Sequence, residues 1–425
     1  MTELATAQRP PAPAPPAMPR ARRPSAWLAA FVLATLLGLQ PVTTDLMLPA
    51  LPLLAGDLHA AMAPVQLTMS ALILAFGVAQ LAWGPLADRF GRRPVLLTGL
   101  ALYVLASAGT ALAADVTQVI AWRIVQGAAL SVPVVCARAM VRDLYEPHEG
   151  ALVMTKALSG LGLIAISAPL LGGVLAAAFG WRAEPVAMAV AGSLLGGLIW
   201  LRWPETIRLR RPDATRLKPL LAQTAQVLRH PGFRAWALLV SCTYGGLFVF
   251  LSGAGFVLIR VLGLSPLVAG AVMSTTSLAY IAGTFVCRYW LPRHGLAGTV
   301  VRGAGFTVAA CMLMSALALT DLRSVWAVML PTWLYALGHG VHQPCGQAGA
   351  VAGFPHAAGQ ASALAGFVLS LVAFGVGLWL GRALDGTVRP LAGGMAVASA
   401  LTVLVAWTLV RRDGEPQRAV APLPA

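Results

Sequence analysis

One carboxylate in this sequence lies where charged side chains are costly. Asp45 falls well inside a long apolar stretch, whereas the other acidic residues fall in polar stretches or near the ends of apolar ones. Burial away from water favours the uncharged form of a carboxyl, and an acid inside an apolar helix normally marks a path for protons or substrate. Asp45 is therefore a candidate site for binding and releasing a proton. The alternative is a structural carboxylate that is permanently paired with an arginine.

Arg123 is the candidate partner of Asp45. It lies about six residues into its own apolar segment, and Asp45 lies twelve residues before Asp57. At about 1.5 Å per residue, the two side chains start roughly 9 and 18 Å below the same surface, a difference that a long arginine can span after helix tilt. We expect Arg123 to hold Asp45 ionised until substrate binds or the arginine moves. The alternative is an arginine that extends to the membrane interface.

A polar stripe marks a later apolar segment. His339 and Gln343 stand four residues apart and continue to Gln347, while His342 follows His339 by three residues. Polar side chains on one side of an apolar helix must face the bundle interior or a water-filled cavity. We expect the stripe to line a substrate cavity, and a buried structural network is the alternative. Two histidines without a nearby acid or cysteine make a poor metal site, so we expect no metal.

The composition explains why such polar residues stand out. Of 425 residues, 58% are hydrophobic and only 11% are charged, and the mean hydropathy is +0.77. Soluble domains carry about 25% charged residues, and a membrane-spanning helix needs about 20 mainly apolar residues. Soluble and disordered classes are therefore excluded, and the sequence predicts an all-α membrane protein.

The apolar segments divide into two sets of six around the one sizeable polar connection. We predict twelve transmembrane helices in two pseudo-symmetric six-helix bundles. The expected helices are 26–54, 65–83, 95–113, 117–141, 152–179 and 186–201, followed by 235–259, 268–290, 300–319, 325–350, 361–380 and 391–410. The expected organisation is a disordered cytoplasmic tail (1–25), a first bundle (26–201), a basic cytoplasmic linker (202–234), a second bundle (235–410) and a cytoplasmic tail (411–425).

The net charge of +15 is explained by membrane orientation. With both termini placed in the cytoplasm, 24 of the 30 lysines and arginines lie on that side, five lie on the other side, and Arg123 lies within a span. Positive residues concentrate in cytoplasmic loops. We therefore expect both termini to be cytoplasmic, with a lipid bilayer rather than a nucleic acid as the partner of these charges.

A ten-residue motif connects the second and third expected helices. Residues 84–93 read GPLADRFGRR, which is similar to the signature G-x-L-[AS]-D-R-x-G-R-[RK] of the major facilitator superfamily. Its first glycine permits close helix contact, its second permits a sharp turn, and its aspartate can bind a helix N-terminus or an arginine. With the basic end of the fourth helix, the resemblance implies a cytoplasmic gate made of Gly84, Asp88, Arg89, Gly91, Arg92 and Arg142.

Further motifs resemble the bicyclomycin/chloramphenicol-resistance (Bcr/CflA) group of drug:proton antiporters in that superfamily. They are TTDLMLPALP (43–52), RIVQG (123–127), ARAMVRDLY (137–145), APLLGG (168–173) and, more loosely, LSGAGFVL (251–258). The resemblance implies an antiporter helix containing Pro169, Gly172 and Gly173, and a substrate cavity lined by Gln126, Phe256, His339, His342 and Gln343. The loop 288–303 lacks the acid of the signature, and the tenth helix lacks the group's P-N-A-x-A run, which leaves the substrate open.

These features predict a secondary transporter that exports small amphipathic drugs, such as chloramphenicol- or bicyclomycin-like antibiotics, in exchange for protons. A proton-coupled uptake symporter is the alternative within transport, and an integral membrane enzyme is the alternative outside it. No phosphate-binding G-x-x-x-x-G-K-[ST] motif is present, which excludes ATP-driven pumping by this chain. We expect a functional monomer in the bacterial inner membrane that needs no cofactor.

Overall fold

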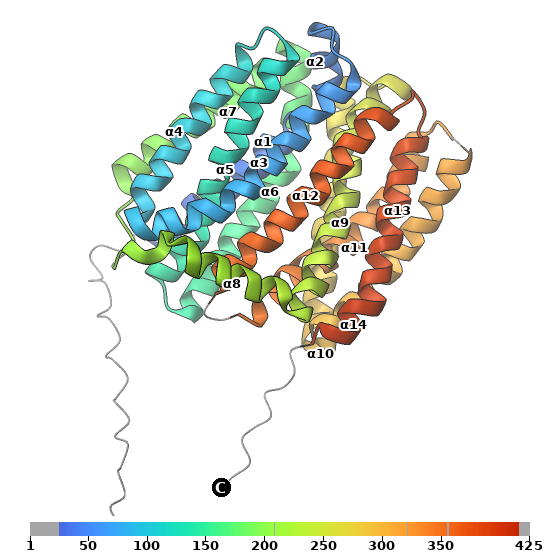
Figure 1. Cartoon of the computed structure of the whole chain (residues 1–425). Coiled ribbons are helices and arrows are strands. Elements are labelled where there is room, and N and C mark those ends of the chain that lie inside the picture. Colours follow the sequence, from blue (N-terminus) through green and yellow to red (C-terminus); the bar gives the residue numbers. More distant parts are fainter. Residues whose placement is uncertain (1–24, 208, 321, 355–356, 416–425) are drawn as a thin grey trace, which may run out of the picture.

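The computed structural model describes residues 25–207, 209–320, 322–354 and 357–415 as two helical bundles side by side (Figure 1). Residues 1–24 of the predicted N-terminal tail and most of the predicted C-terminal tail lie outside these ranges. The first bundle contains α1 (Ala26–Asp45), α2 (Leu51–Asp57), α3 (Met62–Phe90), α4 (Arg92–Ala111), α5 (Val116–Leu144), α6 (Pro147–Phe179) and α7 (Ala183–Arg202).

The second bundle follows a connection that contains a short 3-10 turn and α8 (Leu217–Arg229). Its helices are α9 (Pro231–Phe256), α10 (Pro266–Thr320), α11 (Val325–Ala352), α12 (Ala358–Ala383), α13 (Arg389–Val405) and α14 (Arg411–Asp413). The 55-residue α10 is two helices joined at Gly295, whose φ of 66° and ψ of −176° interrupt the helix. The expected loop there is therefore a sharp kink.

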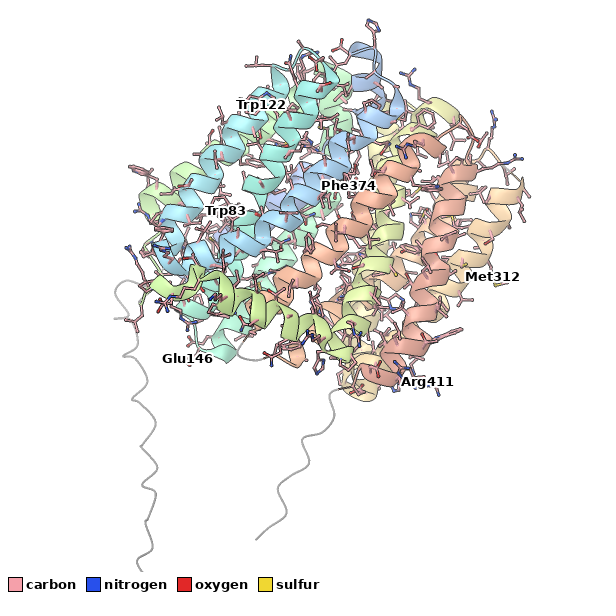
Figure 2. All side chains as sticks on the ribbon, in the orientation of Figure 1. Trp83, Trp122, Glu146, Met312, Phe374 and Arg411 are labelled. Carbon is pink, nitrogen blue, oxygen red and sulfur yellow. The ribbon has the colours of Figure 1, made fainter. Side chains whose placement is uncertain are left out.

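Ten helices in the described ranges are long and apolar enough to cross a membrane. Dividing α10 at Gly295 and adding α11, which carries the polar stripe, gives six membrane-length helices in each half of the described chain. Charged side chains such as Glu146 and Arg411 lie at the end of the bundle that carries α8, which we call the linker end (Figure 2). The predicted fold of two six-helix bundles is confirmed.

The first helix ends earlier than expected, at Asp45. A helix continuing through residue 49 would need the N–H of that residue to bind the carbonyl of Asp45, and Pro49 has no N–H and clashes with that carbonyl. The chain therefore makes turns over 46–50 before α2 begins. The acid that the sequence singled out thus lies at a break in an apolar helix, where backbone groups are freed to take other partners.

The two halves contact each other along their length. Gln66 on α3 donates a 2.7 Å hydrogen bond to the carbonyl of Ser252 on α9, and Ser277 on α10 donates a 3.2 Å bond to the carbonyl of Ala165 on α6. Near the linker end, Arg138 on α5 donates to the hydroxyl of Ser362 on α12 at 2.9 Å. Few polar bonds therefore join the halves, so the interface between them depends mostly on packing.

Candidate functional site

Asp45 lies half-buried at the end of α1, on the side of that helix that approaches the second half. The hydroxyl of Thr44 donates to its carboxylate at 2.6 Å. Its charge acts on Tyr244 of α9, which places the two side chains near each other across the boundary between the halves. A carboxyl with one neutral partner and partial exposure can take up and release a proton without breaking an ion pair.

Arg123 is fully buried inside the first half. Its guanidinium donates to the side chain of Gln126 at 2.7 Å, to the carbonyl of Thr43 at 3.3 Å and to the sulfur of Met69 at 3.0 Å. None of these acceptors is charged. The described structure contains no ion pair between Arg123 and Asp45, so the direct pairing expected from their depths is absent from this conformation.

The helical rotation of α1 explains why the two side chains do not meet. Residues two apart on an α-helix point about 200° away from each other. The side chain of Thr43 bonds the hydroxyl of Tyr103 at 2.7 Å, on the side where Arg123 reaches the Thr43 carbonyl. Asp45 therefore points away from Arg123, and its charge acts on Tyr244 of the other half. The depths of Asp45 and Arg123 in the membrane do not define the directions in which their side chains point around the helices.

A second buried acid was missed by the sequence analysis. Glu184, which we expected to be an ordinary helix-end residue, has 0% relative exposure. Both of its carboxylate oxygens lack a hydrogen-bond partner among the described residues, and the positive charge of Arg123 acts on it. One signal was available, because Glu184, Met188, Gly192, Leu195 and Ile199 follow a helical period and form the buried stripe of α7.

The polar stripe of α11 lies within the second half. His339 bonds the hydroxyl of Thr243 at 3.0 Å and contacts the ring of Tyr280, while His342 bonds the hydroxyl of Thr307 at 3.1 Å. Both histidines are buried, so they belong to a hydrogen-bonded network between α9, α10 and α11. Within the described ranges, no three His, Cys, Asp or Glu side chains gather as a metal site would require.

The other expected cavity residues are divided between the halves. Gln126 is buried in the first half, where its side-chain amide donates to the hydroxyl of Ser107 at 2.7 Å and its side-chain oxygen accepts a hydrogen bond from Arg123. Phe256 and Gln343 are half-buried in the second half, and the side-chain oxygen of Gln343 has no partner among the described residues. The structure therefore does not gather the five residues into one surface.

The charged loop between α3 and α4 is organised by Arg92. Its guanidinium contacts Asp88 at 2.5 Å and Asp143 of α5 at 3.1 Å, and the hydroxyl of Thr206 also donates to Asp143. Arg142, expected in this cluster, is exposed and lies beside Gly359 of the second half. Arg92 rather than Arg142 therefore bridges the two aspartates.

The connection between the halves is bonded to the same loop. Arg89 donates to the hydroxyl of Thr215 at 2.7 Å, and the backbone N–H of Arg211 donates to the carbonyl of Asp88 at 2.9 Å. Farther along, Gln360 at the start of α12 donates to the carbonyl of Leu220 and the hydroxyl of Thr224, both on α8. Figure 1 shows α8 crossing both bundles at this end.

The turn itself depends on Gly91 and on Glu205, which the sequence analysis did not select. Gly91 has a φ of 110°, a conformation that side chains other than glycine rarely adopt. Glu205 follows α7 and accepts hydrogen bonds from the backbone N–H groups of Arg92 at 3.0 Å and Arg93 at 3.2 Å. A carboxylate at a helix N-terminus satisfies free N–H groups and the helix dipole.

The glycines of the expected antiporter helix allow very close backbone contact at the end opposite the linker end. A side-chain carbon on Gly172 would lie 1.9 Å from the carbonyl oxygen of Leu46, and one on Gly173 would lie 2.6 Å from that of Pro266. The carbonyl of Pro169 approaches Gly270 of α10 to a comparable degree. α6 thereby packs against the break after α1 and against the second half.

The sequence matches the profile described as Major Facilitator Superfamily over residues 26–378. The chain belongs to the major facilitator superfamily. It is 31% identical over 319 residues to a protein of Pseudomonas aeruginosa named chloramphenicol resistance protein, covering 74% of each chain. It is 29% identical to multidrug resistance protein D of Escherichia coli, covering 91% of this chain and 97% of the relative.

The named relatives place this transporter in the Bcr/CflA group, as the motifs had indicated. Its fold is similar to that of an inward-facing bacterial homologue of the human lysosomal transporter Spinster, with a TM-score of 0.69, 16% identity and coverage of 91% and 96% of the two chains. It is a multi-pass membrane transporter and not an enzyme, and proteins of this superfamily bind small-molecule substrates within the membrane.

Proposed function

We propose that this transporter exports small amphipathic drugs from the bacterial cytoplasm in exchange for protons, by alternating access between its two halves. The names of its relatives, which refer to chloramphenicol and multidrug resistance, support drugs as the substrate class. The antiporter-type sequence of α6 supports export rather than uptake. The proposed site of exchange lies between the halves, next to Asp45.

The position of Asp45 carries this proposal. It is the acid at the break in α1, it has a single neutral side-chain partner, and its charge acts on a tyrosine of the other half. A carboxylate there is costly to desolvate, so it favours either a proton or a cationic substrate. Mutually exclusive binding of the two is sufficient to couple drug export to proton entry.

The remaining residues take supporting roles in this mechanism. Asp88, Arg89, Gly91 and Arg92, with Gly84 on the preceding helix and Arg142 facing the second half, form the proposed cytoplasmic gate. The gate opens when the bonds between the α3–α4 loop, the linker and α12 separate. Pro169, Gly172 and Gly173 close the opposite end by backbone contact.

We propose that Phe256 and Gln343, with their partial exposure, contact substrate directly. Gln126, His339 and His342 then act from behind the cavity surface, by fixing the helices that present those side chains. The protein functions as a monomer in the inner membrane. Both termini and the segment 202–234 face the cytoplasm, which agrees with the distribution of lysine and arginine.

Proteoliposomes test the mechanism. The purified transporter is reconstituted, a pH gradient and a membrane potential are imposed separately, and export of a neutral and a cationic drug is measured. Asp45→Asn keeps the side-chain size and removes the proton, so proton-driven export should be lost. Asp385→Asn, a change at an exposed acid, is the matched control and should transport at the parental rate. Full proton-driven export by Asp45→Asn would refute the proposal.

The same vesicles separate export from uptake. A proton gradient directed with the drug rather than against it would drive accumulation only by a symporter. Reporter fusions after Arg211 and after Gly414 test the topology, since both should report the cytoplasmic side. A reporter on the opposite side at either position contradicts the proposed orientation.

A further inference from the structure

We propose that Glu184 is a second proton-binding carboxyl, and that the guanidinium of Arg123 alternates between neutral acceptors and this carboxylate during the transport cycle. This inference rests on the proposed proton exchange and adds a second proton to it. In the described conformation Arg123 is held by Gln126 and by the carbonyl of Thr43, while Glu184 accepts no hydrogen bond.

The surroundings of the Glu184 carboxyl favour its neutral form. Glu184 is fully buried, and both oxygens lack partners among the described residues. An ionised carboxylate with no donor in such a site is very costly, whereas the neutral acid is tolerated far better. A first-turn acid that merely stabilised the dipole of α7 would bind free N–H groups of that turn, and Glu184 binds none.

The positive charge of Arg123 acts on this carboxyl. Gln126, which accepts from Arg123, also contacts the sulfur of Met188, one helical turn along α7 from Glu184. Arg123 and Glu184 interact electrostatically although no bond joins them, and the Nε of Arg123 has no partner among the described residues. A rearrangement of the arginine side chain is the movement that we propose forms the missing ion pair.

The other groups around this site leave the exchange to these two residues. Tyr103 on α4 bonds the hydroxyl of Thr43 and packs its ring against Gly192 of α7. Arg182, two residues before Glu184, pairs with Asp57 at the surface, where the two side chains are 44% and 50% exposed. Glu184 is therefore close to water at the end opposite the linker, and protons reach it from that side.

The proposed exchange conserves charge. Protonated Glu184 is neutral, and Arg123 keeps its positive charge on Gln126 and the Thr43 carbonyl. When the transporter opens to the cytoplasm and Glu184 releases its proton to that side, Arg123 leaves those acceptors and pairs with the carboxylate. Loss of the Arg123 bond frees the carbonyl of Thr43, two residues before Asp45, so proton exchange at Glu184 is transmitted to the end of α1.

Infrared spectroscopy tests the protonation directly. Spectra of the purified transporter recorded at acidic and alkaline pH should show a protonated carboxyl band that disappears on alkalinisation. The band should persist in Asp45→Asn, where only Glu184 contributes to it, and it should be missing in the double variant Asp45→Asn/Glu184→Gln. The control Asp57→Asn, which perturbs the same corner without removing a buried acid, should keep it. The absence of this band in Asp45→Asn, or its persistence in the double variant, would overturn the proposal.

Transport provides a second measurement. With the membrane potential collapsed, one pH unit supports a gradient of a neutral drug of about tenfold for each proton exchanged. The parental transporter and Asp57→Asn should reach about a hundredfold, and Glu184→Gln about tenfold or, if Arg123 is left without its alternate partner, no gradient. An unchanged hundredfold limit in Glu184→Gln would overturn the role of Glu184. Absence of any proton-driven gradient in the parental protein would instead refute the proposed function, and the infrared result would remain decisive for Glu184.

Discussion

Gly91 in the first half and Gly295 in the second half make the same turn, each with a positive φ and an extended ψ. In both, a glutamate that follows the last helix of the half reaches the N–H groups after the glycine. Glu205 accepts from Arg92 and Arg93, and Glu415 accepts from Ala297 at 3.2 Å. The halves therefore repeat the same glutamate-capped glycine turn, although the loop 288–303 of the second half lacks the acid of the signature motif.

Next to this glycine turn, the first half also carries a network of charged side chains. Arg92 bridges Asp88 and Asp143 there, whereas the equivalent positions of Asp88 and Arg92 next to Gly295 are occupied by Pro292 and Leu296. The same contrast extends into the interiors, because the first half buries Arg123 and Glu184, and the second buries neutral groups such as His339 and Tyr335. We infer that the first half carries the charge-dependent steps of transport and the second half carries substrate recognition.

The largest effect is expected from substitution at the two turn glycines. In Gly91→Ala the added carbon would lie 2.5 Å from a Glu205 oxygen, and in Gly295→Ala it would lie 3.0 Å from a Glu415 oxygen. Strain of this backbone conformation costs about 1–3 kcal/mol at either position. Gly91→Ala should lower the thermal unfolding midpoint more, because it also displaces the better-bonded glutamate. Equal unfolding midpoints in the two variants would show that Glu205 and Glu415 stabilise their turns equally.

The second prediction compares the two glutamates. Glu205 accepts four backbone N–H groups, including those of Thr206 and Ile207, whereas Glu415 accepts that of Ala297. Hydrogen bonds to a charged group are worth about 1.5–3 kcal/mol each when buried, and less here because both sites are near water. We expect Glu205→Gln to cost about 2 kcal/mol and Glu415→Gln below about 1 kcal/mol in unfolding measurements. The reverse order would contradict the comparison.

The third prediction separates gating from capping. Arg92→Ala removes the bridge between Asp88 and Asp143 without touching Gly91 or Glu205. Turnover should fall roughly tenfold, which corresponds to about 1.4 kcal/mol, with a smaller change in the unfolding midpoint than Gly91→Ala gives. Arg293 is the second-half counterpart of Arg89, and its guanidinium donates to the carbonyl of Tyr289. Arg293→Ala should transport within about twofold of the parental rate. Parental turnover in Arg92→Ala would remove the gate from the mechanism.

The fourth prediction concerns recognition by the second half. His339→Ala disrupts the contact with Thr243, and Gln343→Ala removes a half-exposed amide, so each should change the relative export of different drugs. A change of about fivefold in the ratio of the export rates of two drugs corresponds to about 1 kcal/mol. Competition transport with a drug panel measures this. An unchanged spectrum together with lost thermal stability would assign the histidine to structure alone.

The smallest effect on stability is expected at two exposed acids, Asp57 and Asp385, at the end of the molecule opposite the linker end. The N–H groups of Trp181 and Arg182 hold the pKa of Asp57 below its ordinary value, and the Thr387 hydroxyl lowers the pKa of Asp385. A carboxyl with a depressed folded pKa contributes stability above its unfolded pKa, and this contribution is lost as pH falls through the folded value. Asp57→Asn and Asp385→Asn should each reduce the acid sensitivity of the unfolding midpoint. Parental acid sensitivity in Asp57→Asn would show that its ion pair contributes nothing.

The class of the protein followed from its sequence because burial in a membrane is a property of whole segments. Apolar segment lengths predicted the helices, and the basic linker predicted their division into two sets. The signature residues 84–93 indicated the turn at Gly91, since a positive φ is available mainly to glycine. The break after Asp45 could also have been predicted from the nearby Pro49, although we expected one continuous helix over 26–54.

The partners of the charged residues depended on tertiary structure. Asp45 and Arg123 were correctly singled out by type and depth, yet they point to different sides of α1, and spacing along one helix cannot reveal its rotation against its neighbours. Glu184 looked like a helix-end acid because a sequence shows how near a residue is to a helix end but not what packs over it. Which arginine bridges Asp88 and Asp143 was likewise decided by the approach of α5 to the α3–α4 turn, a contact between residues about fifty positions apart in the chain.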